Sequence, residues 1–342
     1  MRGTIKLIVV DQDFWFIVIA GLGFVADAVA EGHLSILRII TIVAMGGLAV
    51  SYIYRKLKLQ REKKVPFLVV VGKSDEQYRD TLSQVEEALT GYRLEVSLLE
   101  ETFGLLREDW IFRRESPLPS NPAVWRETIA KIDRRFWRLA ERIPGRKVYH
   151  LFMNGPAALA MALGAVIGSR TDFVYYHFMP GTGTMPYHPV VDFSSVTIPE
   201  GPHILKSRVD QYQLVRVTGM ERLDLDDRSQ VYVAIHLTGH NPIGDVRQRA
   251  RADQRPVVTI ESRSPGTVPL SADWIRLARE VATPLLEMMG REGVERLHLF
   301  LSTPLPIAFC VGVALGRFVR ASVYNYFREM GTYEEVFKLE EV

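Results

Sequence analysis

The sequence has a single cysteine, Cys310, among 342 residues, and a formal charge of only +2 from 42 basic and 40 acidic residues. One cysteine excludes a disulfide framework and a multi-cysteine zinc site. A charge this close to zero removes bulk basicity as an argument for nucleic-acid binding, so no direct DNA binding is expected. The content of 47% hydrophobic and 24% charged residues excludes wholesale disorder, and the length fits about two domains.

Recognisable catalytic motifs are also missing: there is no G-x-G-x-x-G, no P-loop and no G-x-S-x-G elbow. Cys310 lies within an apolar helical pattern, which predicts a core residue and not a nucleophile. His150 and His298 each open an apolar strand pattern, which favours buried, hydrogen-bonded rings over a metal pair. His177 and His188 lie eleven residues apart, which is no standard ligand spacing. We therefore expect no catalytic residue, no metal and no cofactor.

Two apolar runs lie near the N-terminus, at 14–30 and 36–54, and each approaches the ~20 residues that span a bilayer core. Residues 55–64 hold six basic residues, whereas the link between the runs holds none. The positive-inside rule therefore predicts a transmembrane hairpin with the rest of the chain in the cytoplasm. The alternative is a buried hairpin of a soluble domain, which is disfavoured because neither run has a polar stripe of helical period.

The remainder of the chain contains an internal repeat. Residues 150–168 and 298–316 align without gaps at an offset of 148, and seven of the nineteen positions are identical. The identical pairs are His150/His298, Leu151/Leu299, Phe152/Phe300, Pro156/Pro304, Ala160/Ala308, Gly164/Gly312 and Gly168/Gly316. Downstream, VYYHF at 174–178 corresponds to VYNYF at 323–327. A duplicated α/β unit explains this similarity, and the two copies would form one body with a pseudo-two-fold axis.

Each unit is expected to alternate apolar strands with helices, which predicts a mostly parallel sheet covered on both faces. The expected strands are 66–71, 93–99, 147–153 and 172–178 in the first copy and 231–237, 256–261, 296–301 and 321–327 in the second. The expected helices are 75–90, 123–143 and one beginning at Pro156, then 273–290 and one beginning at Pro304. We therefore predict three parts: 1–64, 65–228 and 229–342. Asp224, Asp226 and Asp227 would lie in the linker between the last two.

Ligands of open α/β sheets sit outside the carboxyl ends of the strands. Four loops follow predicted strands there and combine small residues with hydroxyl, amide or cationic groups. They are Gly72-Lys73-Ser74, Asn154-Gly155-Pro156, Thr238-Gly239-His240-Asn241 and Ser302-Thr303-Pro304. Two of them lead into helix N-termini, whose free N–H groups suit phosphates. The alternative is that all four are ordinary strand–helix turns, which favour the same residues.

The motif HLF-x₃-P-x₃-A-x₃-G-x₃-G, followed by VYYHF or VYNYF, resembles the SAVED domain. The resemblance covers about residues 65–342 and is strongest at 296–333. It implies two tandem CARF-like Rossmann units, here preceded by a two-helix transmembrane hairpin as in membrane effectors of CBASS antiphage systems. It also implies binding of an adenine-containing cyclic tri- or tetranucleotide, made by a CD-NTase-type nucleotidyltransferase.

The same resemblance implies assembly into a homo-oligomer. Because the two copies have diverged, their outer faces are unlike, so contacts between successive molecules would be head to tail and would close a ring or extend as a filament. Sensing without catalysis would drive assembly, and the N-terminal helices would disrupt the bacterial inner membrane and abort infection. Two alternatives remain open: a SAVED-like sensor of a type III CRISPR system anchored to the membrane, and a membrane-tethered nucleotide-dependent α/β enzyme.

Overall fold

The computed structural model describes residues 63–92, 94, 96–181, 185–194, 200–224, 229–264 and 266–342. Residues 64–143 and 148–342 form one compact unit. The predicted membrane runs at 14–30 and 36–54 lie outside the described residues, as do Asp226 and Asp227. Within the described ranges, no helix is both long enough and apolar enough to cross a membrane.

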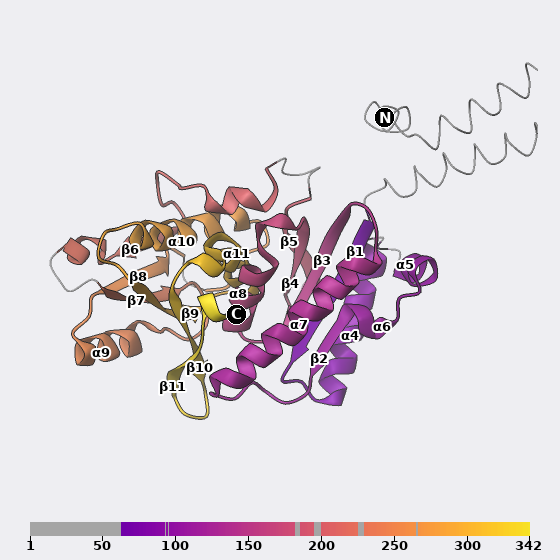
Figure 1. The fold of residues 1–342 in the computed structure, drawn as a ribbon, viewed down its shortest axis with the longest axis horizontal. Helices are drawn as coiled ribbons and strands as arrows, with labels where there is room; N and C mark the ends of the chain where they lie inside the picture. The colour runs from indigo at the N-terminus through magenta and orange to yellow at the C-terminus, as the bar shows by residue number, and fades with distance from the viewer. Residues whose placement is uncertain are drawn as a thin grey trace, which may run out of the picture. The chain divides into compact units, whose positions relative to one another are not determined.

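The first sheet has five strands in the order β2-β1-β3-β4-β5 (Figure 1). Its strands are β1 (Lys63–Val71), β2 (Ile111–Arg114), β3 (Lys147–Asn154), β4 (Phe173–Phe178) and β5 (Tyr187–Asp192). β2 pairs with β1 in parallel and β4 with β3 in parallel, whereas β5 runs antiparallel to β4. The central strands are buried over nearly their whole length, as expected for continuous apolar runs covered on both faces.

The second sheet repeats this arrangement and adds one strand, in the order β11-β10-β9-β7-β8-β6. Its strands are β6 (Val215–Thr218), β7 (Gln230–His236), β8 (Val257–Ser262), β9 (Arg296–Ser302), β10 (Ala321–Phe327) and β11 (Thr332–Lys338). β7, β8, β9 and β10 are parallel, while β6 and β11 run antiparallel at the two edges. β8, β7, β9, β10 and β11 therefore correspond to β2, β1, β3, β4 and β5. The extra strand β6 precedes the predicted boundary at 228.

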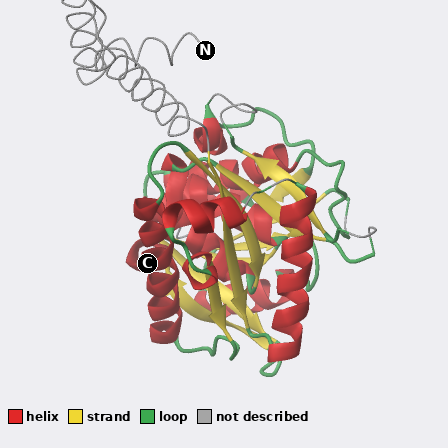
Figure 2. Cartoon of the chain, turned by 90° about the vertical axis from the view of Figure 1, so that its right-hand side faces the viewer, coloured by secondary structure: helices red, strands yellow, loops and turns green. Residues whose placement is uncertain are grey.

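Helices lie on both sides of the strands (Figure 2). They are α4 (Asp75–Gly91), α5 (Val96–Phe103), α6 (Arg107–Trp110), α7 (Pro122–Arg142), α8 (Ala157–Ile167), α9 (Ile243–Asp253), α10 (Trp274–Met289) and α11 (Leu305–Leu315). Five 3₁₀ turns complete the described elements: η1 (Gly168–Arg170), η2 (Gly201–Lys206), η3 (Met220–Asp224), η4 (Gly316–Phe318) and η5 (Leu339–Glu341). Pro156 and Pro304 are the N-caps of α8 and α11, which confirms the predicted starts of both helices.

The strand predicted at 93–99 is wrong. Val96–Phe103 forms helix α5, and the second strand of the first sheet is β2, further along the chain. The physical reason is the spacing of Val96, Leu99 and Phe103, which pack on the core one helical turn apart. The equivalent prediction at 256–261 is confirmed by β8. The antiparallel strands β5, β6 and β11 were not predicted.

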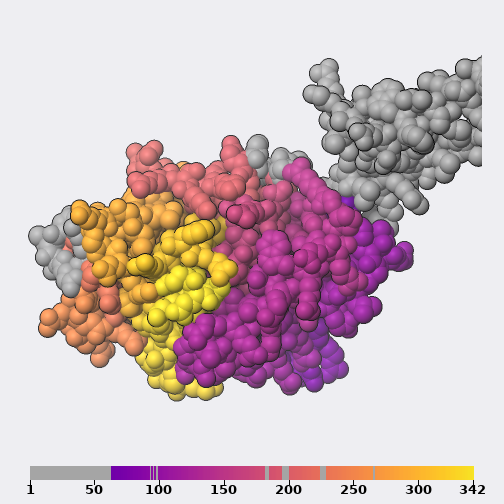
Figure 3. Space-filling model, viewed as in Figure 1, coloured from indigo at the N-terminus to yellow at the C-terminus, as the bar shows by residue number. Residues whose placement is uncertain are grey.

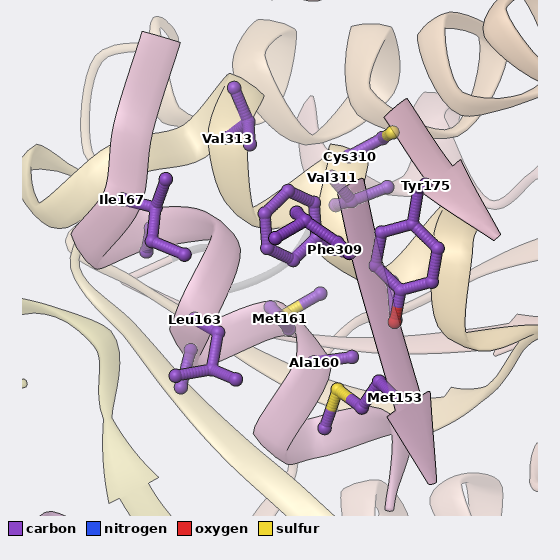
Figure 4. Packing of buried hydrophobic residues seen from close by; sticks show 14 of the residues in the cluster. Met153, Ala160, Met161, Leu163, Ile167, Tyr175, Phe309, Cys310, Val311 and Val313 are labelled. Atoms are coloured by element: carbon purple, nitrogen blue, oxygen red, sulfur yellow. The ribbon is translucent and has the colours of Figure 1, made fainter. Parts of the chain in front are cut away.

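α8 and α11 are apolar around their whole circumference and are buried between the sheets. Figure 4 shows Phe309 of α11 beside Met161 of α8 and Tyr175 of β4; the rings of Phe309 and Tyr175 have centroids 5.2 Å apart. A Cβ on Gly164 would overlap the carbonyl oxygen of Phe309, and a Cβ on Gly312 would overlap that of Met161. Met161 and Phe309 are again 148 residues apart. The contact is therefore reciprocal, as a pseudo-two-fold axis between the two copies requires.

The C-terminal strand also packs on the first copy. Trp125 of α7 lies against Phe337 of β11 with ring centroids 6.0 Å apart, and the side chain of Arg126 lies 3.2 Å from that of Glu341. In Figure 3 the yellow C-terminal residues cover the surface next to the purple start of α7. The two copies thus share one continuous hydrophobic core.

Candidate functional site

The structure places the four predicted loops at the carboxyl ends of β1, β3, β7 and β9, and we call them the strand-end loops. In the first sheet β1 and β3 are neighbours, so their loops adjoin. A Cβ on Gly155 would lie 3.7 Å from the Cβ of Val71, the last residue of β1. Gly72 has a φ of +73° and donates its N–H to the carbonyl oxygen of Arg114 at 2.9 Å, so this turn requires glycine.

The two loops of the second sheet are joined by hydrogen bonds. The backbone N–H groups of Leu237 and Thr238 donate to the carbonyl oxygen of Ser302 at 2.8 and 3.2 Å. The hydroxyl of Ser302 donates to the carbonyl oxygen of Thr238. Gly239 has a φ of +72°, and a Cβ there would lie 3.4 Å from the Ser302 hydroxyl. These bonds fix the loops as one rigid edge.

Two further predicted ligand groups, those of Ser74 and Asn241, also have structural partners. Ser74 caps α4: its hydroxyl accepts the N–H of Gln77, and the Gln77 side chain accepts the N–H of Ser74. Asn241 uses its side-chain oxygen to accept the N–H of Ile243 at 2.9 Å. At these two positions the local structure agrees with ordinary strand–helix turns. Nothing in the structure tests either residue as a ligand contact, and both stay predictions.

Three other polar groups at the strand ends have no side-chain partner among the described residues. Lys73 is half-buried and forms no ion pair there, and Asn154 is half-buried with an uncommitted amide. Thr303 is 9% exposed, and its hydroxyl oxygen is buried without a hydrogen-bond partner. Because a buried polar atom without a partner costs free energy, Thr303 is the group most in need of one. Together the three offer a cation, an amide and a hydroxyl next to the N-termini of α4, α8 and α11.

An aromatic pair adjoins the loop after β7. The ring of His240 stacks on Tyr326 with centroids 4.1 Å apart and planes 20° apart, and Tyr333 lies 6.0 Å away. The carboxylate of Asp245, which lies on α9, is 3.2 Å from the Nε2 of His240 and holds the ring in place. The His240 side chain is 45% exposed, so the stack is partly open to solvent. A flat, partly exposed ring pair of this kind can stack with a nucleobase.

Sequence reasoning missed Tyr326, Tyr333 and Asp245 as parts of this edge. In the motif Tyr326 aligns with His177, whereas the strand registers place it 148 residues after Phe178, at the equivalent position of the first sheet. Tyr333 lies on the unpredicted strand β11, opposite Tyr326 in the pairing register. The repeat pairs Tyr333 with Tyr187, which lies opposite Phe178 in the first sheet, so the sequence indicated the correspondence but not the place of Tyr333 at this edge.

The histidines predicted to be structural are buried and hydrogen-bonded. The Nδ1 of His150 lies 2.9 Å from the Tyr176 hydroxyl, and the Nδ1 of His298 lies 3.0 Å from the Tyr324 hydroxyl. Burial lowers the pKa of both rings to about 4. In each bond the histidine and the tyrosine are 26 residues apart, and the two bonds lie at equivalent positions of the repeat. Both copies therefore contain the same His–Tyr pair.

The side chains of His177 and Cys310 are also shielded from solvent. His177 packs against Trp274 with ring centroids 5.0 Å apart, and burial lowers the pKa of His177 to about 4. Cys310 is fully buried, and burial raises the pKa of its thiol. No group of three or more His, Cys, Asp or Glu in the described ranges could hold a metal ion.

Residues 206–339 match one protein-family model. The family is SAVED, the SMODS-associated and fused to various effectors sensor domain. The SAVED match contains all six strands of the second sheet, and so it includes Thr238 to Asn241 and Ser302 to Pro304. Over this segment the resemblance expected from the sequence is confirmed, whereas the transmembrane hairpin is not shown.

Solved structures with similar folds include the Acinetobacter baumannii Cap4 SAVED/CARF-domain receptor with the cyclic trinucleotide 2′3′3′-cAAA and the same receptor with 3′3′3′-cAAA. Each has a TM-score of 0.49 and 13% identity over 87% of this chain and 56% of the Cap4 chain. The Moraxella osloensis Cap4 receptor has a TM-score of 0.42 and 13% identity, covering 64% of this chain and 43% of its own. This chain thus spans little more than half of the Acinetobacter receptor. No curated protein matches it.

Proposed function

We propose that this chain is a sensor in antiphage defence that binds a cyclic oligonucleotide at its strand-end loops. The observation that carries the proposal is the SAVED match over residues 206–339, because the family is described as a sensor domain. That segment forms the second sheet, and the unsatisfied hydroxyl of Thr303 lies at its carboxyl edge. A bound ligand would supply the missing partner.

Each open group at the strand ends suits one part of such a ligand. The Lys73 ammonium is a charged donor for a phosphate diester, and the N-termini of α8 and α11 favour negative charge. The Asn154 amide and the Thr303 hydroxyl can hydrogen-bond base edges or sugar hydroxyls. The partly exposed His240 stack is a platform for an adenine ring. Charge, hydrogen bonding and stacking together therefore support a cyclic oligonucleotide as the ligand class.

Calorimetric titration of the purified protein with cyclic di-, tri- and tetraadenylates tests this proposal. The cyclic trinucleotides found with the Acinetobacter receptor are the first probes, and a linear triadenylate is the control. Lys73→Glu should weaken binding at least tenfold, about 1.4 kcal/mol, whereas the matched reversal Lys131→Glu on α7 should not. Ser302→Trp and Asn154→Trp should block the two loop pairs. Unchanged affinity in both Trp variants would place the ligand elsewhere.

We further infer that the N-terminal segment is the effector of a CBASS-type membrane system. Two apolar runs followed by six basic residues support an inner-membrane location with the sensor in the cytoplasm. Ligand made by a CD-NTase-type nucleotidyltransferase would drive the sensors to assemble, and clustered N-terminal runs would then breach the bilayer and abort infection. In this scheme the chain signals by binding and assembly and performs no catalysis.

A further inference from the structure

A cavity lies at the opposite end of the second sheet from the strand-end loops, where β8 begins and α9 ends. It has a volume of about 450 Å³ and lies between the turn after β6 and the last two turns of α9. Figure 1 shows α9 and β6 at the same end of the molecule. The strand-end loops follow the carboxyl ends of the parallel strands, so this cavity is a separate site. Its lining residues are mainly polar, and we call it the arginine pocket.

The arginine pocket carries an excess of positive charge. Arg222, Arg247, Arg251 and Arg255 line it, against a single acidic residue, Glu221. Arg247 and Arg251 are four residues apart on one side of α9, and Arg255 follows the end of the helix. Like charges at this spacing repel, which costs stability unless an anion lies between them.

Three of the four guanidinium groups, those of Arg222, Arg247 and Arg251, are not occupied in closing the helix or in ion pairs within the described residues, whereas Arg255 donates to the Ser229 hydroxyl at 3.0 Å. The last carbonyls of α9 already accept backbone N–H groups, from Gln254 to Ala250 and Arg251 and from Arg255 to Ala250. Arg222, Arg247 and Arg251 form no ion pair with any residue that the structure describes, and Arg247 and Arg251 are exposed. The charge is therefore available to a bound group.

The backbone gives the pocket a fixed shape. Gly219 has a φ of +93°, and a Cβ there would overlap the carbonyl oxygen of Val257, so the turn after β6 lies directly against the start of β8. This contact holds Arg222 opposite α9. The hydroxyls of Thr218 and Thr259 lie 2.6 Å apart at the wall formed by the paired strands.

We propose that the arginine pocket binds a small anion with two or more linked phosphate groups, such as a di- or triphosphate. Guanidinium groups match phosphate oxygens with paired hydrogen bonds, and several around one cavity can bind adjacent phosphates. The volume lies within the usual range of roughly 300–1,000 Å³ for small-molecule sites. A nucleoside triphosphate and inorganic polyphosphate share this chemistry. The inference does not rest on the proposed sensing of a cyclic oligonucleotide.

Calorimetric titration of the full chain with sodium tripolyphosphate and, separately, with ATP tests the proposal. Both probes should bind the wild type, more weakly as salt rises. The double variant Arg247→Gln/Arg251→Gln should bind at least tenfold more weakly, while Arg138→Gln, an exposed arginine on α7, should change nothing. The affinity of Arg247→Lys should lie between those of the wild type and the double variant, because lysine keeps the charge but cannot form paired hydrogen bonds. Equal affinity for the two probes would show that the pocket binds the phosphate chain alone. Tighter binding of ATP would show that the pocket also contacts the nucleoside.

Two results would overturn the proposal. One is that the wild type and the double variant bind the probes with equal affinity and that neither protein unfolds at a different temperature when a probe is added. The other is that the double variant changes only the oligomeric state, which would assign the arginines to an acidic surface of a second copy. Binding of a cyclic triadenylate should be the same in the double variant and the wild type, so failure of this site and failure of the proposed sensor site are distinguishable.

Discussion

At the scale of single residues, the buried histidines make the stability depend on pH. His150 and His298 are 5% and 7% exposed, and burial lowers the pKa of each ring to about 4. In the unfolded chain the pKa of a histidine is about 6.5. Between these values the unfolded state binds more protons than the folded state, so stability falls as the pH falls from 6.5 to 4.

Replacing His298 alone measures how much of the pH dependence of stability comes from this ring. His298→Gln keeps a hydrogen-bonding group near Tyr324 and removes the titration, so the melting temperature should fall less steeply between pH 6.5 and 4 than in the wild type. Thermal unfolding followed by circular dichroism at closely spaced pH values measures the two slopes. Parallel slopes in both proteins would show that His298 is already protonated in the folded state.

Thr303 gives a prediction in which stability and binding change in opposite directions. Its hydroxyl is buried without a partner, so Thr303→Val removes an unsatisfied group at nearly constant volume. The free protein should unfold at a higher denaturant concentration, with a gain of about 1 kcal/mol. Affinity for the cyclic oligonucleotide should fall if the ligand bonds this hydroxyl. A loss of stability in the free protein would mean that the hydroxyl is satisfied by water.

Glu280 holds the segment that leads into β6. It is completely buried, and its carboxylate accepts the N–H groups of residues 213, 214 and 215 at 3.0, 2.7 and 3.0 Å and a bond from Arg276 at 3.0 Å. Burial raises the pKa of Glu280, but these donors outweigh it and the pKa lies below its usual value. Protonation at acid pH should therefore release the segment.

Glu280→Gln should destabilise the fold by about 2–4 kcal/mol in urea unfolding, because the amide turns a donor toward backbone N–H groups. Arg276→Gln is the matched control: it removes one partner and keeps the carboxylate, so its effect should be smaller. If the two variants lose the same stability, the carboxylate bonds to the backbone contribute nothing beyond the ion pair.

At the scale of elements, the central feature is the crossing of α8 and α11 at Gly164 and Gly312. Gly312→Ala places a methyl group on the carbonyl oxygen of Met161, so the helices must separate. Loss of about 1–3 kcal/mol is expected, although alanine favours helix more than glycine does. Gly244→Ala in α9, where nothing lies within 4 Å, should instead stabilise by about 0.5–1 kcal/mol. Chemical denaturation of both variants tests the contrast.

The elements that sequence reasoning found are those repeated with long apolar runs, such as β3, β9, α8 and α11. The strand predicted at 93–99 was wrong because a short apolar run has no unique period until its neighbours are placed. β5 and β11 were missed because partly exposed residues interrupt the buried ones in each strand and each carries charge, unlike the buried parallel strands. At the site, the loop positions followed from the strand ends. The stack of His240 on Tyr326 joins a loop to strand β10 across the sheet, and it has no local sequence signal.

At the scale of the whole molecule, the two copies face each other across α8 and α11, and their outer edges differ. The first sheet ends in β2, whereas the second ends in the added antiparallel strand β6. Contacts between successive molecules through unlike edges are heterologous, and such contacts close into rings or extend as filaments. A ligand favours assembly only by its greater affinity for the assembled state.

The assembly mechanism predicts that ligand binding and toxicity can be separated. A variant lacking residues 1–55 keeps every described strand and helix, so it should fold, bind a cyclic oligonucleotide and grow in size by light scattering when ligand is added. Cells that make the ligand should be depolarised by the full chain and not by this variant, because only the full chain carries the runs at 14–30 and 36–54. Lys73→Glu in the full chain should spare the cells by blocking the first step. If the truncated protein still kills them, toxicity resides in the α/β unit, and an enzymatic activity there must replace membrane disruption as its cause.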